Sequence, residues 1–490
     1  MITALIMIPA VAGVAAFLIR KPALCRGLLI ASAVAHLALV ALCWRATPAP
    51  TAGGWLSLDA PGLLFLSIAS VLFLLASVYR VGPARVEAPK RDFEEGFLFT
   101  STPESIFSGC MLLFLSTMTL VCTSQQSGLV WIAIEATTLA SAPLIYFHRH
   151  RRSLEAAWKY LLICSVGIAL ALLGNFFLAV SASGVEGGSS LVFGALTLEA
   201  RAGMLGPVWL RAAFLLMLVG YGTKMGLAPM HTWLPDAHSE SPSSVSALLS
   251  GALLNCSFLG ILRIQQLLFA AGDGEFGGGL LVGFGLLSMA VAGVFIIGQR
   301  DYKRMLAYSS VEHMGILAVG VGLGGAAVFG AMFHAVGHSL TKAALFLTAG
   351  NILTAYRTKN VAEVRGLRRF LPASGILWIA GFLAITGMPP FSTFLSEFTI
   401  LTSAVSQGRN GVAAAYLALL AVVFIGMMIA MMGMAQGESS ACRVGSKERE
   451  KMLSILPPAL MLIAVLVLGL GIPQGIGRVL RQAALAVGGA

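Results

Sequence analysis

Long apolar segments separated by short polar loops recur along the whole chain. Each segment is about long enough to cross ~30 Å of hydrocarbon at 1.5 Å per helical residue. The segments are continuously apolar instead of alternating, which predicts helices and not the strands of a barrel. We therefore predict an all-α integral membrane protein. Its expected spans, numbered in chain order, are about fourteen: 1–19, 24–44, 61–79, 105–122, 128–147, 156–178, 208–228, 245–269, 278–298, 303–323, 328–353, 373–401, 412–434 and 457–480.

Composition narrows the possible functions. The 490 residues are 58% hydrophobic and 11% charged, with a mean hydropathy of +0.88, which excludes an ordinary soluble globular protein. The seven cysteines lie far apart, so an iron–sulfur cluster or structural zinc is not expected. The chain has no phosphate-binding loop and no dinucleotide-binding glycine motif. We expect no metal, no cofactor and no catalytic site of its own.

The basic residues are distributed unevenly between the loops. Loops after odd-numbered spans hold most of the Lys and Arg residues, whereas those after even-numbered spans hold only Arg45, Arg201, Arg211, Arg263 and Arg409. Cytoplasmic loops carry such an excess, so both termini are predicted to lie outside the cytoplasm. The basic residues of these loops explain the net charge of +11, so the charge does not indicate nucleic-acid binding.

Two ionisable residues inside spans five and seven suggest an ion path. Glu135 lies within the apolar run LVWIAIEATTLASA, and Lys224 lies five residues before Pro229, where span seven should break. Buried charges in membranes are costly, and broken helices commonly build ion sites. We predict that the two residues form a pair whose proton affinity changes with small movements. A packing carboxylate bonded to Thr137 or Thr138, or a fixed structural ion pair, is the alternative.

Span twelve has the same organisation as span seven. Gly387, Met388, Pro389 and Pro390 interrupt it, and Glu397 follows. Broken helices in corresponding positions indicate two inverted five-helix repeats, spans 4–8 and 9–13. The expected organisation is an N-terminal three-helix segment (1–100), a translocating core (101–435), and a cytoplasmic loop with a last helix (436–490).

Span eleven carries a stripe of ionisable residues. His334, His338 and Lys342 are spaced four residues apart, so they share one face of a helix. Since histidine titrates near neutral pH, a proton wire is the main interpretation. A metal site is the competing one, although no third ligand is evident from the sequence.

Further polar residues lie beside these candidates. The loop 226–244 could form an access vestibule or a rigid partner-binding loop, and Lys159, near the start of span six, is typical of an interfacial anchor paired with Glu155. Glu312 and His313 could extend the polar axis from span ten. The accessory candidates are Lys159, His231, Asp236, His238, Asn255, Glu312 and His313.

Five segments resemble one family of membrane subunits. They read LVWIAIEATTLASAPLI, GYGTKMGLAPMHTWLPDAHSESPSSVSALLSGALLN, KRMLAYSSVEHMG, FHAVGHSLTKAALFLTAGNI and GMPPFSTFLSEF. Together they resemble the proton-conducting antiporter-like family of respiratory complex I, multi-subunit cation/proton antiporters and membrane-bound nickel–iron hydrogenases. EATTLAS, SLEAAWKY and LPDAHSESPSSVSALLS are most similar to the hydrogenase-4 component F branch.

The resemblance implies a fourteen-helix fold and roles for the candidate residues. Glu135 and Lys224 would be the input pair, the span-eleven residues the central axis and Glu397 the exit residue. Where many family members hold a lysine in span eight, this chain has Asn255, which cannot carry a proton charge at neutral pH. Pumping through a simple lysine relay is therefore in question.

The expected function is proton translocation as a non-catalytic subunit of a redox-driven complex in the cell inner membrane, of the hydrogenase or formate hydrogenlyase type. The expected partners are other membrane-arm subunits and a peripheral hydrogenase or dehydrogenase module, with H⁺ or Na⁺ as the transported ion and no nucleic acid. The alternatives are a subunit of a complex I-like dehydrogenase, a subunit of a multi-subunit Na⁺/H⁺ antiporter, and a non-pumping membrane partner of an enzyme such as an inorganic-carbon uptake system.

Overall fold

The computed structural model describes residues 1–81, 103–184, 190–437 and 450–489, and their secondary structure is helical apart from isolated bridges. Short 3₁₀ or π segments join several helices: η1 (Ala52–Gly54), η2 (Tyr146–His148), η3 (Met230–Thr232) and η4 (Leu249–Leu253). The α-helices are α1 (Ile2–Leu18), α2 (Pro22–Arg45), α3 (Ala60–Val81), α4 (Pro103–Thr123), α5 (Ser127–Ile145), α6 (Arg151–Ser181), α7 (Phe193–Arg201), α8 (Pro207–Met225), α9 (Trp233–Glu240), α10 (Ser243–Leu248), α11 (Leu254–Ala270), α12 (Gly274–Ile296), α13 (Tyr302–Leu323), α14 (Ala326–Tyr356), α15 (Leu367–Phe370), α16 (Pro372–Ile385), α17 (Ser392–Ser406), α18 (Asn410–Ala435), α19 (Met452–Leu470) and α20 (Gln474–Ala486).

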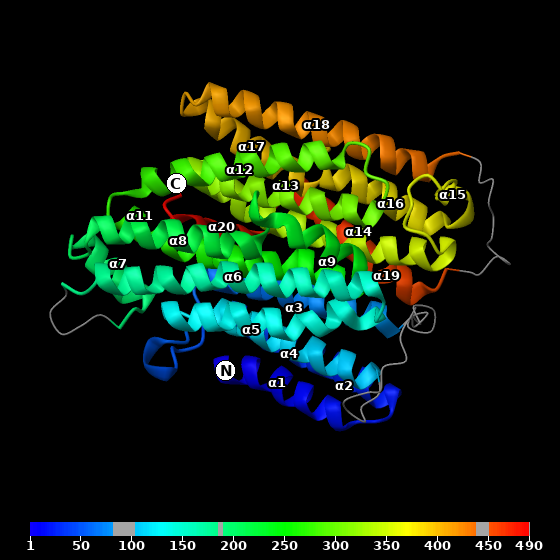
Figure 1. Cartoon of the computed structure of the whole chain (residues 1–490), viewed down its shortest axis with the longest axis horizontal. Coiled ribbons are helices and arrows are strands. Elements are labelled where there is room, and N and C mark those ends of the chain that lie inside the picture. The colour runs from blue at the N-terminus through cyan, green and yellow to red at the C-terminus, as the bar shows by residue number, and fades with distance from the viewer. Residues whose placement is uncertain (82–102, 185–189, 438–449, 490) are drawn as a thin grey trace.

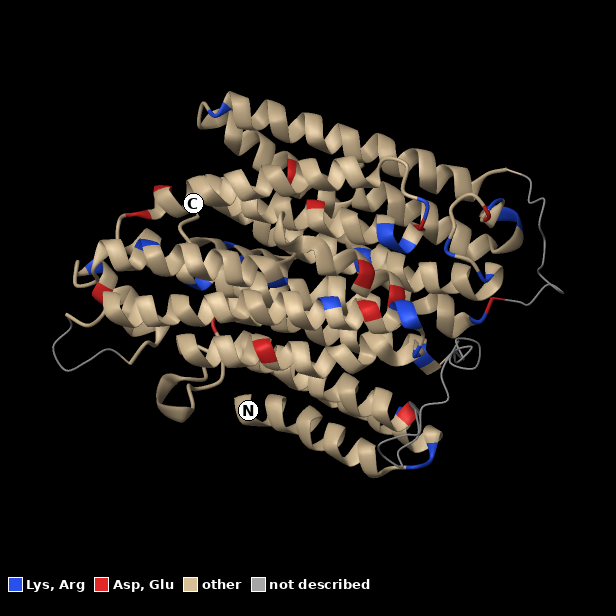
Figure 2. Ribbon diagram, in the orientation of Figure 1, with Lys and Arg blue, Asp and Glu red and all other residues tan. Residues whose placement is uncertain are grey.

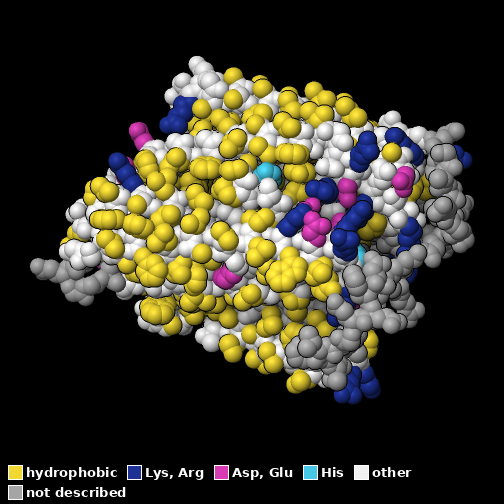
Figure 3. Space-filling view, viewed as in Figure 1, with side chains coloured by type: hydrophobic (Ala, Val, Ile, Leu, Met, Phe, Trp, Pro, Cys, Tyr) yellow, Lys and Arg dark blue, Asp and Glu magenta, His cyan; other side chains and the backbone are white. Residues whose placement is uncertain are grey.

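The helices lie side by side in one bundle. They run from α1 and α2 at one edge to α18 at the opposite edge (Figure 1). The helical segments α10–α11 and α13 are buried along their apolar windows, and most of α14 is buried as well. Outer helices expose large apolar side chains, and Figure 3 shows apolar atoms over most of one face. The chain is thus an all-α membrane protein with its most enclosed helices in the middle of the bundle.

The helices follow the predicted spans closely, except at the C-terminal end. Eleven described helical segments are long and apolar enough to cross a membrane, and α1 and α16 are shorter apolar helices. The last predicted span, 457–480, is wrong beyond Leu470, where α19 ends. Gly471 and Pro473 interrupt the helix, and α20 begins anew as an amphipathic helix that packs against α3 and α14. The short helix α7 lies between the predicted spans 156–178 and 208–228, where no helix was predicted.

Two helices are interrupted as the prolines predicted. Gly226, with φ of 87°, ends α8, and the chain continues through η3 into α9. In the second interruption Gly387, with φ of 64°, lies between α16 and α17. Each break contains a cis bond before proline, Ala228–Pro229 and Pro389–Pro390. The breaks place backbone and side-chain polar groups within the bundle.

Charged residues gather at one end of the bundle. Figure 2 shows most Lys and Arg there, together with several acidic residues. The start of α1 and the end of α20 lie away from that end (Figure 1). Which end faces the cytoplasm stays a prediction. This prediction depends in part on basic residues that lie outside the described residues: Arg85, Lys90, Arg91, Arg443, Lys447 and Arg449.

Candidate proton path

Lys224 is enclosed at the end of α8. The helix stops two residues later, and the side chain is fully buried. Its Nζ donates hydrogen bonds to Tyr160 Oη, at 2.8 Å, and to Thr138 Oγ1. The ammonium also lies 4.7 Å from the centre of the Tyr160 ring, within the range of a cation–π contact. Lys224 is therefore held by two hydroxyl groups from α5 and α6.

Glu135 reaches Lys224 through one intervening hydroxyl. This side chain on α5 is half-buried, and it accepts hydrogen bonds from Thr138 Oγ1 at 3.1 Å and from Ser165 Oγ at 3.0 Å. Thr138 thus donates to the carboxylate while accepting from Lys224. Thr138 bridges Glu135 and Lys224, and no direct ion pair joins the two among the described residues. The bond between Glu135 and Thr138 is the one expected for a packing carboxylate, the alternative to the predicted pair.

A second hydroxyl chain leaves Lys224 through Tyr160. The phenol lies 2.7 Å from Ser141 Oγ, and Ser141 donates to the carbonyl of Thr137 at 2.6 Å. Because the Tyr160 oxygen accepts from Lys224, its own proton is free to point to Ser141. This chain fixes the position of the phenol and therefore that of the ammonium.

Asn255 lies between the two halves of the bundle. It is buried on α11, which packs against α8. Its Nδ2 donates to the Gly251 carbonyl at 2.9 Å and to Ser339 Oγ on α14 at 2.7 Å, whereas its Oδ1 has no protein partner. The π segment η4 precedes it and directs Ser250 to Ser310, 2.8 Å away on α13. Polar groups thus line the contact between α11, α13 and α14.

Lys342 is the second fully buried lysine. Its Nζ donates to the carbonyl of Leu306 on α13 at 2.8 Å. Ser310 donates to the same carbonyl at 3.1 Å. A lysine held by a neutral carbonyl instead of a carboxylate can lose its proton without breaking an ion pair. Lys342 is therefore suited to exchanging a proton.

Three buried histidines form a compact group beside Lys342. His313 Nδ1 lies 2.8 Å from His334 Nε2, and the ring of His338 is 4.8 Å from that of His313. His334 Nδ1 lies 2.9 Å from Ser396 Oγ. The stripe predicted on α14 is present, but His313 on α13 joins its two histidines, which the sequence only suggested as an extension.

The hydrogen bonds assign the protons on two of these rings. Ser396 Oγ donates to the Thr393 carbonyl at 2.7 Å, so it must accept from His334 Nδ1–H. The Nε2 atom of His334 then carries the lone pair and accepts from His313 Nδ1–H. His313 is left with a bare Nε2, which lies 4.0 Å from Glu312 Oε2. A proton arriving from the Glu312 side would meet an open acceptor.

Glu397 completes this group from α17. It is buried, and its Oε1 has no hydrogen-bond partner in the protein. A Cβ at residue 387 would collide with its Oε2, so Gly387 makes the space for the carboxylate. His313, His334 and Glu397 each offer one atom that could bind a metal, and these three atoms lie within 4.8 Å of one another. Three predicted residues from three helices therefore meet, and they form a set that could also hold a metal ion.

The loop after α8 has an interior side and a surface side. His238 is buried between Trp233 and Phe346, and His231 packs against Phe295 and Tyr308. One nitrogen of each ring lacks a protein partner: Nε2 of His238 and Nδ1 of His231. The interior of the loop therefore carries two titratable rings.

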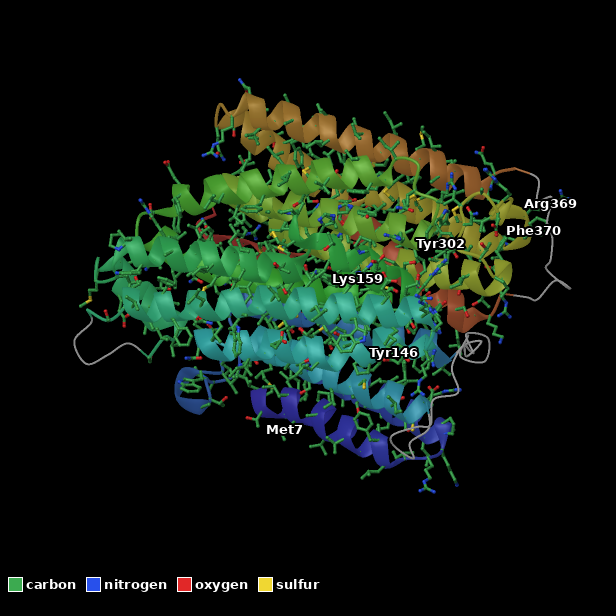
Figure 4. All side chains as sticks on the ribbon, viewed as in Figure 1. Met7, Tyr146, Lys159, Tyr302, Arg369 and Phe370 are labelled. Carbon is green, nitrogen blue, oxygen red and sulfur yellow. The ribbon has the colours of Figure 1, made fainter. Side chains whose placement is uncertain are left out.

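Lys159 and Asp236 lie on the surface side. Lys159 Nζ is 2.6 Å from Glu155 and 3.1 Å from Asp236, and Arg304 also pairs with Asp236 at 3.2 Å. Figure 4 labels Lys159 on α6 of the near face, and Figure 3 shows charged side chains gathered towards one end of that face. Lys159 is thus a surface residue, and its predicted pairing with Glu155 is confirmed.

The main residues missed by the sequence reasoning are hydroxyls that link the candidates. They are Thr138, Tyr160, Ser165, Ser339 and Ser396. Serine and threonine in helices commonly bond their own backbone, so a sequence does not show which of them reach across. A signal was present for Thr138, which follows Glu135 by one helical turn, and for Ser396, the neighbour of Glu397.

Comparisons with known proteins identify the family of the chain. Residues 124–436 match the family described as NADH:quinone oxidoreductase/Mrp antiporter. A hydrogenase-4 component F homolog of Methylacidiphilum infernorum is 41% identical over 66% of this chain and 69% of its own length. Hydrogenase-4 component B of Escherichia coli is 29% identical over 72% of this chain, which spans only 51% of that protein.

Solved structures share the fold. A chain of the archaeal membrane-bound sulfane sulfur reductase superposes with a TM-score of 0.84 at 19% identity, covering 99% of this chain and 97% of that one. A chain of the Mrp complex from Dietzia gives 0.80 at 20% identity, with coverage of 99% and 97%. A chain of respiratory complex I from Thermus thermophilus gives 0.81 at 22% identity, with full coverage of both.

Proposed function

This chain belongs to the NADH:quinone oxidoreductase/Mrp antiporter family of membrane subunits, and from that premise we propose that it moves protons across the membrane within a hydrogenase-type redox complex. Relatives named as hydrogenase-4 components B and F and as an NADH-quinone oxidoreductase subunit support this function. The transported ion and a peripheral hydrogenase or dehydrogenase module are part of the proposal.

One observation carries the proposal: two groups of ionisable residues, each with hydrogen-bonded members, are enclosed on either side of α11. Glu135, Thr138 and Lys224 form the first, and Lys342 with the histidines and Glu397 forms the second. Buried ionisable groups in membrane helices are expensive and serve ion paths by default. Helix packing alone does not account for so many of them in one bundle, and hydroxyls link Glu135 to Lys224 and hold His334.

The first group responds to charge near Glu135. Its carboxylate is half-buried on the outer face of α5 and α6, where Ser165 is exposed. A cation approaching this face would draw the carboxylate away from Thr138, weaken the hold of the shared hydroxyl on Lys224, and so free its proton to move inward. Energy from a redox partner would act on the chain in this way.

The tautomers of the second group offer a path for one proton. His313 accepts a proton at Nε2, from the Glu312 side, and then releases its Nδ1 proton to His334 Nε2. Glu397, with an unpartnered oxygen beside both rings, is the next acceptor and the exit. Between the groups, Asn255 carries no charge, but its free Oδ1 can hold water in place of a lysine.

We further propose the orientation and internal organisation. The end rich in Lys and Arg faces the cytoplasm of a cell inner membrane, with both termini on the opposite side. The two broken helices, α8–α9 and α16–α17, then occupy matching positions in two inverted repeats within residues 101–435. Segments 1–100 and 436–490 flank this core.

The proposal is tested by removing Lys224 from the complete complex. Proton movement into inverted membrane vesicles is followed during substrate turnover for wild type, Lys224→Ala and Lys451→Ala. Lys451 is an exposed lysine that directly precedes α19, so its removal controls for the loss of a lysine as such. We expect Lys224→Ala to assemble and to lose the pH gradient, and Lys451→Ala to retain it. An unchanged gradient in the assembled Lys224→Ala complex would leave a structural membrane partner as the better account.

A further inference from the structure

The group of His313, His334 and Glu397 has the composition of a metal site. Two imidazole nitrogens and one carboxylate oxygen from α13, α14 and α17 lie within 4.8 Å of one another, and all three side chains are buried. Two histidines and one carboxylate, with a further position open, form a common ligand set for Zn²⁺. No third ligand was evident from the spacing of residues, because Glu397 lies more than fifty residues beyond the histidines.

A second observation points to a ligand. Glu397 Oε1 is a buried polar atom without a hydrogen-bond partner in the protein. An unpartnered buried polar atom is costly, so such an atom in a native structure usually has a partner that is not protein. The hydrogen bonds that hold the two rings do not occupy this carboxylate atom.

The surroundings support metal binding by both histidines. Metal-bound histidines almost always donate their other N–H to an oxygen, which orients the ring. His334 Nδ1–H already donates to Ser396 Oγ at 2.9 Å. His313 has Glu312 Oε2 4.0 Å from its Nε2, so a proton transferred from Nδ1 to Nε2 would face a carboxylate oxygen, which has to move closer to accept it. Each ligating ring thus has an outer oxygen available.

Size and charge also fit. Zn–N and Zn–O bonds of about 2.0–2.2 Å place tetrahedral ligand atoms roughly 3.4 Å apart. The two imidazole nitrogens, now 2.8 Å apart with a proton between them, would separate slightly as the ion replaces that proton. The carboxylates of Glu397 and Glu312 together would balance the charge of a divalent ion, so the buried site would be neutral.

We propose that His313, His334 and Glu397 bind one Zn²⁺ or a similar first-row divalent ion, and that the bound ion blocks proton transfer through this group. Binding shifts the His313 proton to Nε2 and releases a proton from Glu397 if the carboxyl group carries one. The lone pair on His334 Nε2 and the carboxylate are then used by the metal. Beside Gly387, the residues Met388, Pro389 and Pro390 are exposed on the surface of the chain.

The binding half of this proposal does not depend on transport, whereas the inhibition half rests on the proposed function. Binding is therefore measured first, without turnover, on the full-length chain in detergent by equilibrium dialysis against Zn²⁺ with metal analysis. The variants are His313→Asn, Glu397→Gln and Ser396→Ala. The control is His36→Asn, because His36 is also a buried histidine held by two hydroxyls, Ser70 and Thr119, at 2.9 Å each.

We expect one Zn²⁺ per chain for wild type and His36→Asn. His313→Asn and Glu397→Gln should bind more than ~100-fold more weakly, and Ser396→Ala, which removes only an outer oxygen, about 10- to 100-fold more weakly. Monodisperse elution of each variant in gel filtration shows that it is folded. Absence of stoichiometric Zn²⁺ in wild type, or equal binding by the folded His313→Asn and Glu397→Gln variants, would overturn the site.

Inhibition is then measured in vesicles containing the whole complex. Zn²⁺ should suppress proton movement by wild type and His36→Asn at the concentrations that saturate binding, and Ser396→Ala should need about 10- to 100-fold more Zn²⁺. Equal sensitivity of Ser396→Ala and wild type would overturn the proposed block. Stoichiometric Zn²⁺ in a chain whose Lys224→Ala variant pumps normally would contradict the proposed function and leave the metal site standing.

Discussion

Thr138 is the link through which Glu135 and Lys224 communicate, and the substitution Thr138→Val removes that link alone. Valine has nearly the shape of threonine, so packing is retained while one hydroxyl is lost. The hydroxyl donates to Glu135 Oε2 at 3.1 Å and accepts from Lys224 Nζ. Any effect of the substitution on proton movement therefore reports on this bridge.

The magnitude follows from the bonds that remain. A hydrogen bond to a charged group contributes about 1.5–3 kcal/mol. Lys224 keeps its bond to Tyr160 and Glu135 keeps its bond to Ser165, so we expect a loss nearer to one bond than to two. If that energy is lost from the transfer step, the rate falls about 10- to 150-fold.

The assay is the initial rate of proton movement into inverted vesicles at saturating substrate. The matched control is Thr137→Val, because the neighbouring hydroxyl donates only to the carbonyl of Ile134, within its own helix, at 2.6 Å. Thr138→Ser should recover most of the rate, since it restores the hydroxyl. Equal rates for Thr138→Val and Thr137→Val would refute the bridging role.

Three other substitutions probe the frame around the path. Asp59→Asn leaves Arg263 buried without its carboxylate partner. This loss costs about 3–5 kcal/mol for a fully buried pair, and less here because Asp59 is 34% exposed. The midpoint of thermal unfolding of the complex should fall by several degrees, and an unchanged midpoint would contradict this. Burial raises the pKa of Asp59, but the Arg263 guanidinium outweighs it and holds that pKa below its usual value, so the pair's contribution persists at neutral pH and is lost as the pH falls below about 4. Gly387→Ala should displace Glu397 and abolish proton movement in an assembled complex. Native gels check assembly and the vesicle assay checks proton movement. Normal pumping would show that Glu397 does not need the space that Gly387 leaves for it. Asn255→Leu should slow proton movement about 10-fold or more by removing a water-holding amide worth roughly 1–3 kcal/mol, and a wild-type rate would exclude Asn255 from the path.

Sequence patterns predicted the helices and the breaks because both have local causes. Continuous apolar runs specify helices in a membrane, and Pro229 or Pro389 interrupts a helix wherever it falls. The predicted span 457–480 runs past the end of α19, because its apolar residues continue beyond Leu470 while Gly471 and Pro473 end the helix. The helix α20 begins directly after these two residues.

The ionisable residues of the site were predictable because a charge within an apolar run stands out. Their partners were not, because they depend on which helices meet. His313 joins His334 only through the packing of α13 against α14, and Ser396 reaches His334 from α17. The bridging of Glu135 and Lys224 by Thr138 likewise requires the positions of two helices. Tertiary packing decides these contacts, and a single sequence does not encode them in any local pattern.

Lys342 offers the most direct test of the central claim that protons pass through the middle of this chain. The measurement is the number of protons moved per substrate turnover in inverted vesicles, for wild type and Lys342→Ala complexes of equal subunit content. Because Lys342 is fully buried and bonded only to a backbone carbonyl among the contacts described, its loss should leave the redox module intact. The account predicts continued turnover with proton movement reduced to background. A wild-type proton-to-turnover ratio in Lys342→Ala would contradict it.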